Sequence, residues 1–98
     1  MRNQQILEEV KSTLALLTAK APGRAIEVRV PPYAAVQCGD GPNHTRGTPP
    51  NTIEMSADTW LALASGKLSW SDAMSSGAIA ASGVRADLSE YLPLGSKL

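Results

Sequence analysis

The chain has 98 residues, and its nine Lys and Arg balance nine Asp and Glu, so the formal net charge at pH 7 is zero. This length supports one domain with one modest core, because a chain of this size buries only about 60–65% of its unfolded surface. Without a net field to attract polyanions, and with only two Trp and two Tyr to stack on bases, the chain is not expected to bind nucleic acid.

Cysteine usage and hydropathy set expectations about the compartment. Cys38 is the only cysteine, so no internal disulfide can form. No charged segment followed by an apolar run opens the chain, and its longest apolar run is far shorter than the roughly 20 residues that cross a bilayer. We therefore expect a cytoplasmic protein without stable membrane insertion.

Residues 2–20 predict an amphipathic helix. Asn3 can cap its start, whereas Pro22 and Gly23 prevent its continuation and make a turn. Its apolar residues recur at steps of three and four: Ile6, Leu7, Val10, Leu14 and Leu17. Residues 1–23 are thus expected to form an N-terminal helix and turn within the single domain 1–98.

Three strands are predicted next. Residues 26–30 alternate apolar and charged side chains, as a strand with one buried face does. Pro31 and Pro32 interrupt hydrogen-bond donation, so a second strand is expected over residues 33–38, and a short third one over 51–55. The prolines favour a sheet edge or a bend.

Two short helices with similar ends follow. Ser56 can cap the first, which ends at Gly66, and Ser69 with Asp72 resembles a capping box at the start of the second, which Gly77 closes. The side chains expected on their buried faces are Trp60, Leu63 and Ala64 in the first helix and Trp70, Ala73 and Met74 in the second.

The chain then predicts a weak strand over residues 78–82 and a short helix over 86–92 that Pro93 stops. The order is one helix, three strands, two short helices, a strand and a short helix. This order favours an α+β domain in which helices pack on one face of a mainly antiparallel sheet.

The segment "TIEMSADTWLALASGKLSWSDAMSSGAIAASGVRADLSEYLPL" is similar to the C-terminal two-thirds of the sterol-carrier-protein-two superfamily. With "VRVPPYAAVQCG" and "HTRGTPPNTIEM" added, residues 24–94 resemble the small bacterial branch of that superfamily. The chain differs from a typical member in lacking its longer, strand-rich front half and in having only a stub of the final helix. The resemblance implies helices on a curved sheet around a hydrophobic cavity, which in the wider family accepts fatty acids, acyl-coenzyme A thioesters or sterols without covalent chemistry.

This resemblance implies a set of ligand-binding residues. The apolar ones are Trp60, Leu63, Trp70, Met74 and Ile79, and His44 with Arg46 would face a head group. The alternative for the two tryptophans is ordinary core packing, because core and cavity wall are one surface in this fold.

The loop "CGDGPNHTRGTPP", residues 38–50, is the other candidate for chemistry. Cys38, Asp40 and His44 are too few ligands for a structural metal site, and no constraint fixes Cys38 and His44 as nucleophile and base. Arg46 offers a bidentate fork for a carboxylate or phosphate, although it could also be a solvated loop residue or pair with a nearby carboxylate. The loop is therefore expected to connect two strands and, if it acts, to recognise an anionic head group.

The sequence as a whole predicts a non-enzymatic binding or carrier domain for a lipid or other apolar molecule, with no metal or cofactor. The alternative is a protein-interaction module that kept the fold without a cavity and buries apolar surface of helix 6–17 in a homodimer. The ending Ser96-Lys97-Leu98 spells a peroxisomal address, but residues 95–98 also read as a cloning-vector junction, which is the interpretation we favour.

Overall fold

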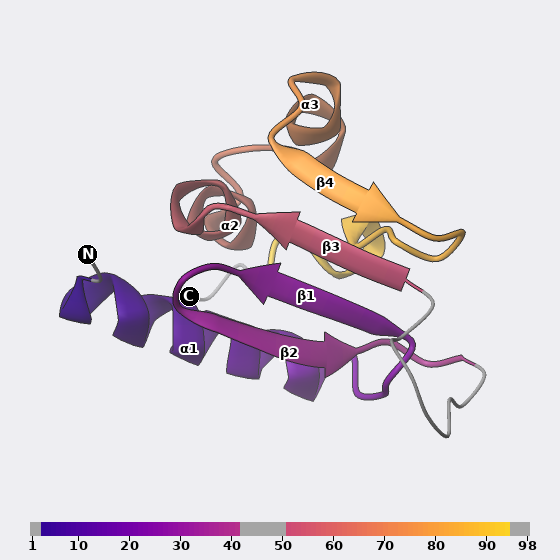
Figure 1. The fold of residues 1–98 in the computed structure, drawn as a ribbon, viewed down its shortest axis with the longest axis horizontal. Coiled ribbons are helices and arrows are strands. Elements are labelled where there is room, and N and C mark those ends of the chain that lie inside the picture. The colour runs from indigo at the N-terminus through magenta and orange to yellow at the C-terminus, as the bar shows by residue number, and fades with distance from the viewer. Residues whose placement is uncertain (1–2, 42–50, 95–98) are drawn as a thin grey trace.

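The computed structural model describes residues 3–41 and 51–94. The elements in chain order are α1 (Gln4–Lys20), β1 (Ile26–Val30), β2 (Ala34–Cys38), β3 (Asn51–Met55), α2 (Ala57–Ser65), α3 (Trp70–Ser75), β4 (Ile79–Ser82) and the 3-10 helix η1 (Ser89–Tyr91). Figure 1 shows their arrangement, with α1 passing behind the sheet and α2 and α3 beside β3 and β4. The fold class is α+β, as the sequence predicted.

The four strands form one mixed sheet in the order β2-β1-β3-β4. β1 pairs antiparallel with β2, and β3 pairs antiparallel with β4. The central pair, β1 with β3, is parallel, in register from Ile26 opposite Asn51 to Arg29 opposite Glu54. The prediction of a mainly antiparallel sheet is confirmed, with the addition of this parallel pair at its centre.

One face of the sheet carries the core. In β1, Ile26, Val28 and Val30 are buried, whereas Glu27 and Arg29 alternate with them on the other face and form an ion pair of 2.8 Å. From α1, three residues of the predicted apolar stripe are fully buried against the sheet: Val10, Leu14 and Leu17. Within the described residues, no helix has both the length and the apolar content that crossing a membrane requires.

Side-chain caps fix where the helices start. The Oδ1 atom of Asn3 accepts from the Ile6 amide at 3.1 Å, Ser56 Oγ accepts from the Thr59 amide at 3.2 Å, and Ser69 Oγ accepts from the Asp72 amide at 3.1 Å. Each of these bonds satisfies a backbone donor that has no partner within its helix. The three predicted caps are therefore present.

Helix α3 differs from expectation in one side chain. It has only six residues, and Ala73 is its one buried residue. Met74, which the sequence placed on the same buried face, is 42% exposed. A helix of fewer than two turns presents a narrow stripe to its neighbours, and here the small Ala73 occupies that stripe, so the longer Met74 is left at the surface.

Candidate functional site

The segment after β4 is held against the ends of two helices. The Leu94 amide donates to the Ala64 carbonyl at 3.1 Å. The Lys20 ammonium, at the end of α1, donates to the carbonyls of Tyr91 at 2.8 Å and Pro93 at 3.1 Å. These bonds place residues 89–94 beside the C-terminal end of α2, where they make one wall of a hollow.

This hollow, called here the α2–α3 hollow, has a volume of about 380 Å³. Its lining comes from α2, the α2–α3 turn, α3 and the C-terminal segment: Leu63, Gly66, Leu68, Ser69, Trp70, Ser71, Ser89, Leu92 and Pro93. The lining is mainly apolar, its polar side chains are three serines, and no charged residue of the described chain belongs to it. It has the composition of a site for an apolar small molecule.

Local sequence explains how the hollow forms. Gly66 ends α2 with a positive φ of 86°, a backbone conformation that residues with a Cβ rarely adopt. The chain then turns through a short connection to Ser69, which caps α3. This sharp reversal sets Leu63 of α2 and Trp70 of α3 on the same hollow, and Pro93 closes it near Gly66.

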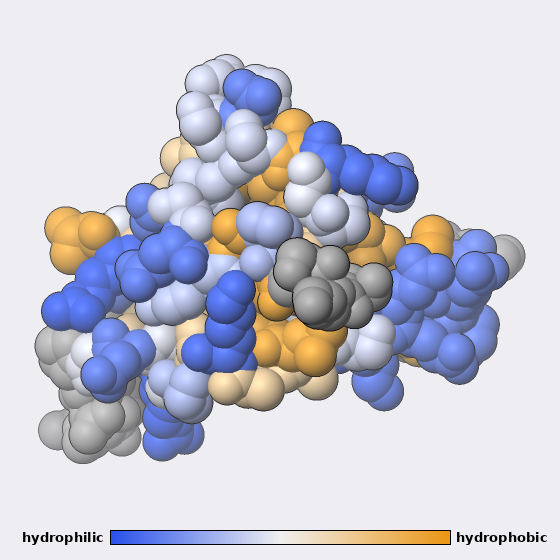
Figure 2. All heavy atoms as spheres, turned by 180° about the vertical axis from the view of Figure 1, so that it is seen from behind, coloured by the Kyte–Doolittle hydropathy of each residue, from blue (hydrophilic) through white to orange (hydrophobic). Residues whose placement is uncertain are grey.

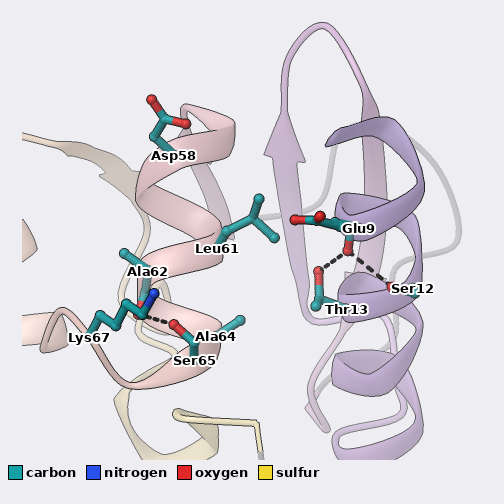
Figure 3. Close-up of a pocket in the computed structure, with 9 residues that line it drawn as sticks. All are labelled: Glu9, Ser12, Thr13, Asp58, Leu61, Ala62, Ala64, Ser65 and Lys67. Atoms are coloured by element: carbon teal, nitrogen blue, oxygen red, sulfur yellow. Dashed lines mark hydrogen bonds between the residues drawn. The ribbon is translucent and has the colours of Figure 1, made fainter. Parts of the chain in front are cut away.

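A second hollow, the α1–α2 groove, lies on the other side of α2 and has a volume of about 470 Å³ (Figure 3). Its lining residues are Glu9, Ser12, Thr13, Asp58, Leu61, Ala62, Ala64, Ser65 and Lys67. In Figure 3, Leu61 extends from α2 toward α1, where Glu9 points back at it. This groove therefore has an apolar floor with charged residues of both signs around it.

Apolar surface on the helical side of the molecule is visible in Figure 2, which views the face opposite to that of Figure 1. Orange surface lies in the middle of this face, and hydrophilic side chains flank it on both sides. The hydrophilic flanks are consistent with the charged outer residues of α1, such as Glu8 and Lys11, which are exposed.

Trp60 is a core residue that lines neither hollow. Its side chain is fully buried, and its indole N–H donates to Thr13 Oγ1 at 2.8 Å. The Thr13 hydroxyl in turn donates to the Glu9 carbonyl at 2.6 Å. This pair of bonds joins α2 to α1 beneath the α1–α2 groove and satisfies a buried donor that would otherwise have no partner.

A polar cluster that the sequence did not indicate lies where β1 and β3 begin. Asn51 is only 2% exposed; its Nδ2 donates to the Ala25 carbonyl at 2.8 Å, and its Oδ1 accepts from the Arg85 amide at 2.9 Å. The Arg85 guanidinium donates to the Asp40 carbonyl at 3.1 Å. Asn51 thus links the start of β1 to the turn after β4. No local sequence pattern predicts this role.

Cys38 is in the core rather than at a reactive surface. Its side chain is fully buried at the end of β2, and burial raises the pKa of its thiol to about 11. The thiol is therefore protonated at neutral pH, whereas nucleophilic attack and metal binding need the thiolate. Across residues 3–41 and 51–94, no group of three or more His, Cys, Asp or Glu is arranged to hold a metal ion.

The structure separates the residues that the sequence grouped as one ligand site. Leu63 and Trp70 line the α2–α3 hollow together. Trp60 and Ile79 belong to the core, and Met74 lies at the surface of α3. The predicted head-group residues His44 and Arg46 lie outside the described residues, as do residues 95–98. Leu68, two residues before Trp70, also lines the hollow, and so do Leu92 and Pro93, which were not predicted because only the tertiary fold brings the C-terminal segment beside α2.

Comparison with known families gives a match over nearly the whole chain. A family model described as "Bacterial SCP ortholog" matches residues 2–94. No curated protein matches closely enough to add a characterised relative. The match extends the resemblance seen in residues 24–94 to α1 as well. The chain therefore belongs to this bacterial SCP ortholog family, a small bacterial branch of sterol-carrier-like proteins.

Proposed function

We propose that this domain is a non-enzymatic carrier that binds a lipid or another apolar molecule in the α2–α3 hollow. The observation that carries the proposal is the shared placement of Leu63 and Trp70 in a mainly apolar hollow of about 380 Å³. Small-molecule sites typically have volumes of about 300–1,000 Å³ with apolar linings and a few polar groups. Membership of the SCP ortholog family supports a carrier-type role.

Burial of an alkyl chain supplies the driving force for such binding. Each methylene removed from water contributes about 0.8 kcal/mol, so six buried methylenes contribute about 5 kcal/mol before the cost of association. Micromolar affinity requires about 8 kcal/mol net, so most of a medium-length chain must be in contact with the protein. We expect medium-length chains to bind weakly and to dissociate readily, as a carrier needs.

The non-enzymatic part of the proposal rests on the state of the single thiol. Cys38 is buried and protonated, and it is absent from the lining of the α2–α3 hollow. The polar side chains of that lining are Ser69, Ser71 and Ser89, and the described residues that line it include no imidazole or carboxylate to activate a hydroxyl. A lone thiol also fits the reducing cytoplasm, which we propose as the compartment.

Tryptophan fluorescence tests the proposal and locates the site. In a Trp60→Phe variant only Trp70 emits, and titration with decanol or decanoate is expected to give a saturable shift with one site per chain. The matched Trp70→Phe variant retains only the core Trp60 and is expected to show a much smaller shift. No saturable change in either variant up to the solubility limit of both probes would overturn the proposal.

The interaction-module alternative predicts a continuous exposed apolar face, which the described residues do not concentrate on one element. The large exposed apolar side chains are Leu16 in α1, Met74 in α3 and Val84 after β4. Single exposed apolar side chains of this kind are ordinary at protein surfaces. Size-exclusion chromatography with light scattering measures whether the homodimer that this alternative expects is formed.

A further inference from the structure

We infer that the α2–α3 hollow selects an uncharged amphiphile, such as a long-chain alcohol, over the carboxylate of the same chain length. This inference rests on the proposed function and adds the chemical class of the ligand's polar end. It is carried by the charge and the hydrogen-bonding groups of the lining, which differ from those of the α1–α2 groove on the other side of the same helix.

The first argument is the lack of a counter-charge. Among the described residues, no Lys, Arg, Asp or Glu lines the α2–α3 hollow, whereas Glu9, Asp58 and Lys67 line the α1–α2 groove. An ionised carboxylate that leaves water for a partly enclosed apolar site loses hydration, and only an opposite charge or several donors compensate for that loss. The described lining residues provide no such charge, so a carboxylate is penalised there.

The cation that contacts the C-terminal wall, Lys20 of α1, already has hydrogen-bond partners. The Lys20 ammonium donates to the carbonyls of Tyr91 and Pro93, at 2.8 and 3.1 Å. On the wall itself, Ser89 lies between the acidic residues Asp87 and Glu90 in the chain, and Asp87 accepts from the Ser89 amide at 2.8 Å. Asp87 and Glu90 line a separate hollow together with Arg85 and offer no positive charge to an anionic head group.

The second argument is that the hollow offers neutral hydrogen-bonding groups. Ser69 Oγ accepts from the Asp72 amide and retains its own O–H to donate. Ser71 and Ser89 add two more hydroxyls to the lining. Trp70, also in the lining, carries an indole N–H donor, whereas the indole N–H of Trp60 is used in its bond to Thr13. An alcohol can both donate hydrogen bonds to such groups and accept hydrogen bonds from them. Because it is uncharged, its burial does not remove the hydration shell of an ion.

A comparison of decanol with decanoate at neutral pH tests the inference directly. In the Trp60→Phe background, decanol is expected to bind at least about tenfold more tightly than decanoate, since uncompensated burial of an ion costs more than a tenfold change in affinity. Equal affinities, or tighter binding of decanoate, would overturn the inference but leave the proposed function standing. If neither probe binds, the proposed function itself fails.

A charge introduced at the rim provides the matched test. Ser71 and Ser75 are both exposed residues of α3, but only Ser71 lines the hollow. Ser71→Lys is expected to tighten decanoate binding severalfold and to leave decanol nearly unchanged, whereas Ser75→Lys, with the same net charge, is expected to leave both affinities as in the parent. An identical response of the two variants would contradict the placement of the polar end in this hollow. Circular dichroism checks that both variants are folded.

Discussion

The two hollows that flank α2 share one helix yet differ in charge and in their relation to tryptophan. The α1–α2 groove has Glu9, Asp58 and Lys67 in its lining and the fully buried Trp60 beneath it. The α2–α3 hollow has serines and a partly buried Trp70 in its wall. Trp60 thus joins α1 to α2, whereas Trp70 lines an open hollow. The difference shows that the role of a tryptophan depends on how many neighbours pack around it, and not on residue type alone.

The largest expected effect is a difference in stability between the two tryptophans. Trp60→Ala should lower the free energy of unfolding by about 3–5 kcal/mol, because it leaves a large cavity in the core. Trp70→Ala should lower it by about 1–2 kcal/mol, since this side chain is only partly buried and removes less contact area. Chemical denaturation measures both values. Similar losses in the two variants would show that Trp70 is as much a core residue as Trp60.

The bond between Trp60 and Thr13 provides a sharper test of cohesion across the α1–α2 groove. Thr13→Val keeps the shape of the side chain but leaves the buried indole N–H without its acceptor. The unfolding free energy should fall by about 1–3 kcal/mol, the usual penalty for an unsatisfied buried donor. Thr13→Ser retains the hydroxyl and serves as the control. A Val variant as stable as the Ser variant would show that water replaces the lost acceptor.

Substitutions at Leu61 and Leu63 test which of the two hollows binds the ligand. Leu61 lines the α1–α2 groove, and Leu63 lines the α2–α3 hollow two residues further along the same helix. Leu63→Ala should weaken decanol binding by about fivefold, through loss of roughly 1 kcal/mol of apolar contact. Leu61→Ala should leave it unchanged. If the effects are reversed in titration calorimetry, the ligand occupies the groove instead.

The smallest expected effect concerns the wall of the α2–α3 hollow. Lys20→Met removes the donor to the Tyr91 and Pro93 carbonyls, so the wall should open more often. We expect a loss of about 0.5–1.5 kcal/mol, typical of an exposed hydrogen-bonded group. Hydrogen exchange should be faster at the Leu94 amide, which bonds to Ala64. Lys11→Met, on the same helix, controls for the lost charge, and equal exchange in both variants would rule out this role for Lys20.

Much of the fold was predictable because it follows from local sequence patterns. The steps of three and four in α1 and the alternation in β1 each reflect which side of the element is buried. The caps at Asn3, Ser56 and Ser69 are likewise local, since each side chain bonds an amide three residues on. Such features need no knowledge of the rest of the chain.

Pairing between distant segments was not predictable from these patterns. The parallel match of β1 with β3 depends on how the chain crosses over after β2, and alternation within each strand is the same for either direction. The buried Asn51 gave no signal, because a single Asn at the start of a strand usually indicates a turn. Both are decided by tertiary contacts.

The candidate site was predicted only in part for a similar reason. Helical spacing correctly placed Leu63 and Trp70 on inward-facing sides, but it could not distinguish a core position such as that of Trp60 from a wall position. That distinction depends on α1, which covers Trp60 through Thr13, and on residues 89–94, which face Trp70 across an open space. Neither neighbour is close in sequence.

The attachment of the C-terminal wall to Lys20 also bears on the order in which the protein becomes functional during synthesis. The Lys20 ammonium and the Pro93 carbonyl that it contacts are 73 residues apart in the chain. All strands and α1, α2 and α3 leave the ribosome before this wall does, since they precede it in the chain. Leu88 and Leu94 belong to the core, so neither the core nor the α2–α3 hollow is complete until the C-terminal segment has been made. The proposed ligand site is therefore completed together with the core rather than after it.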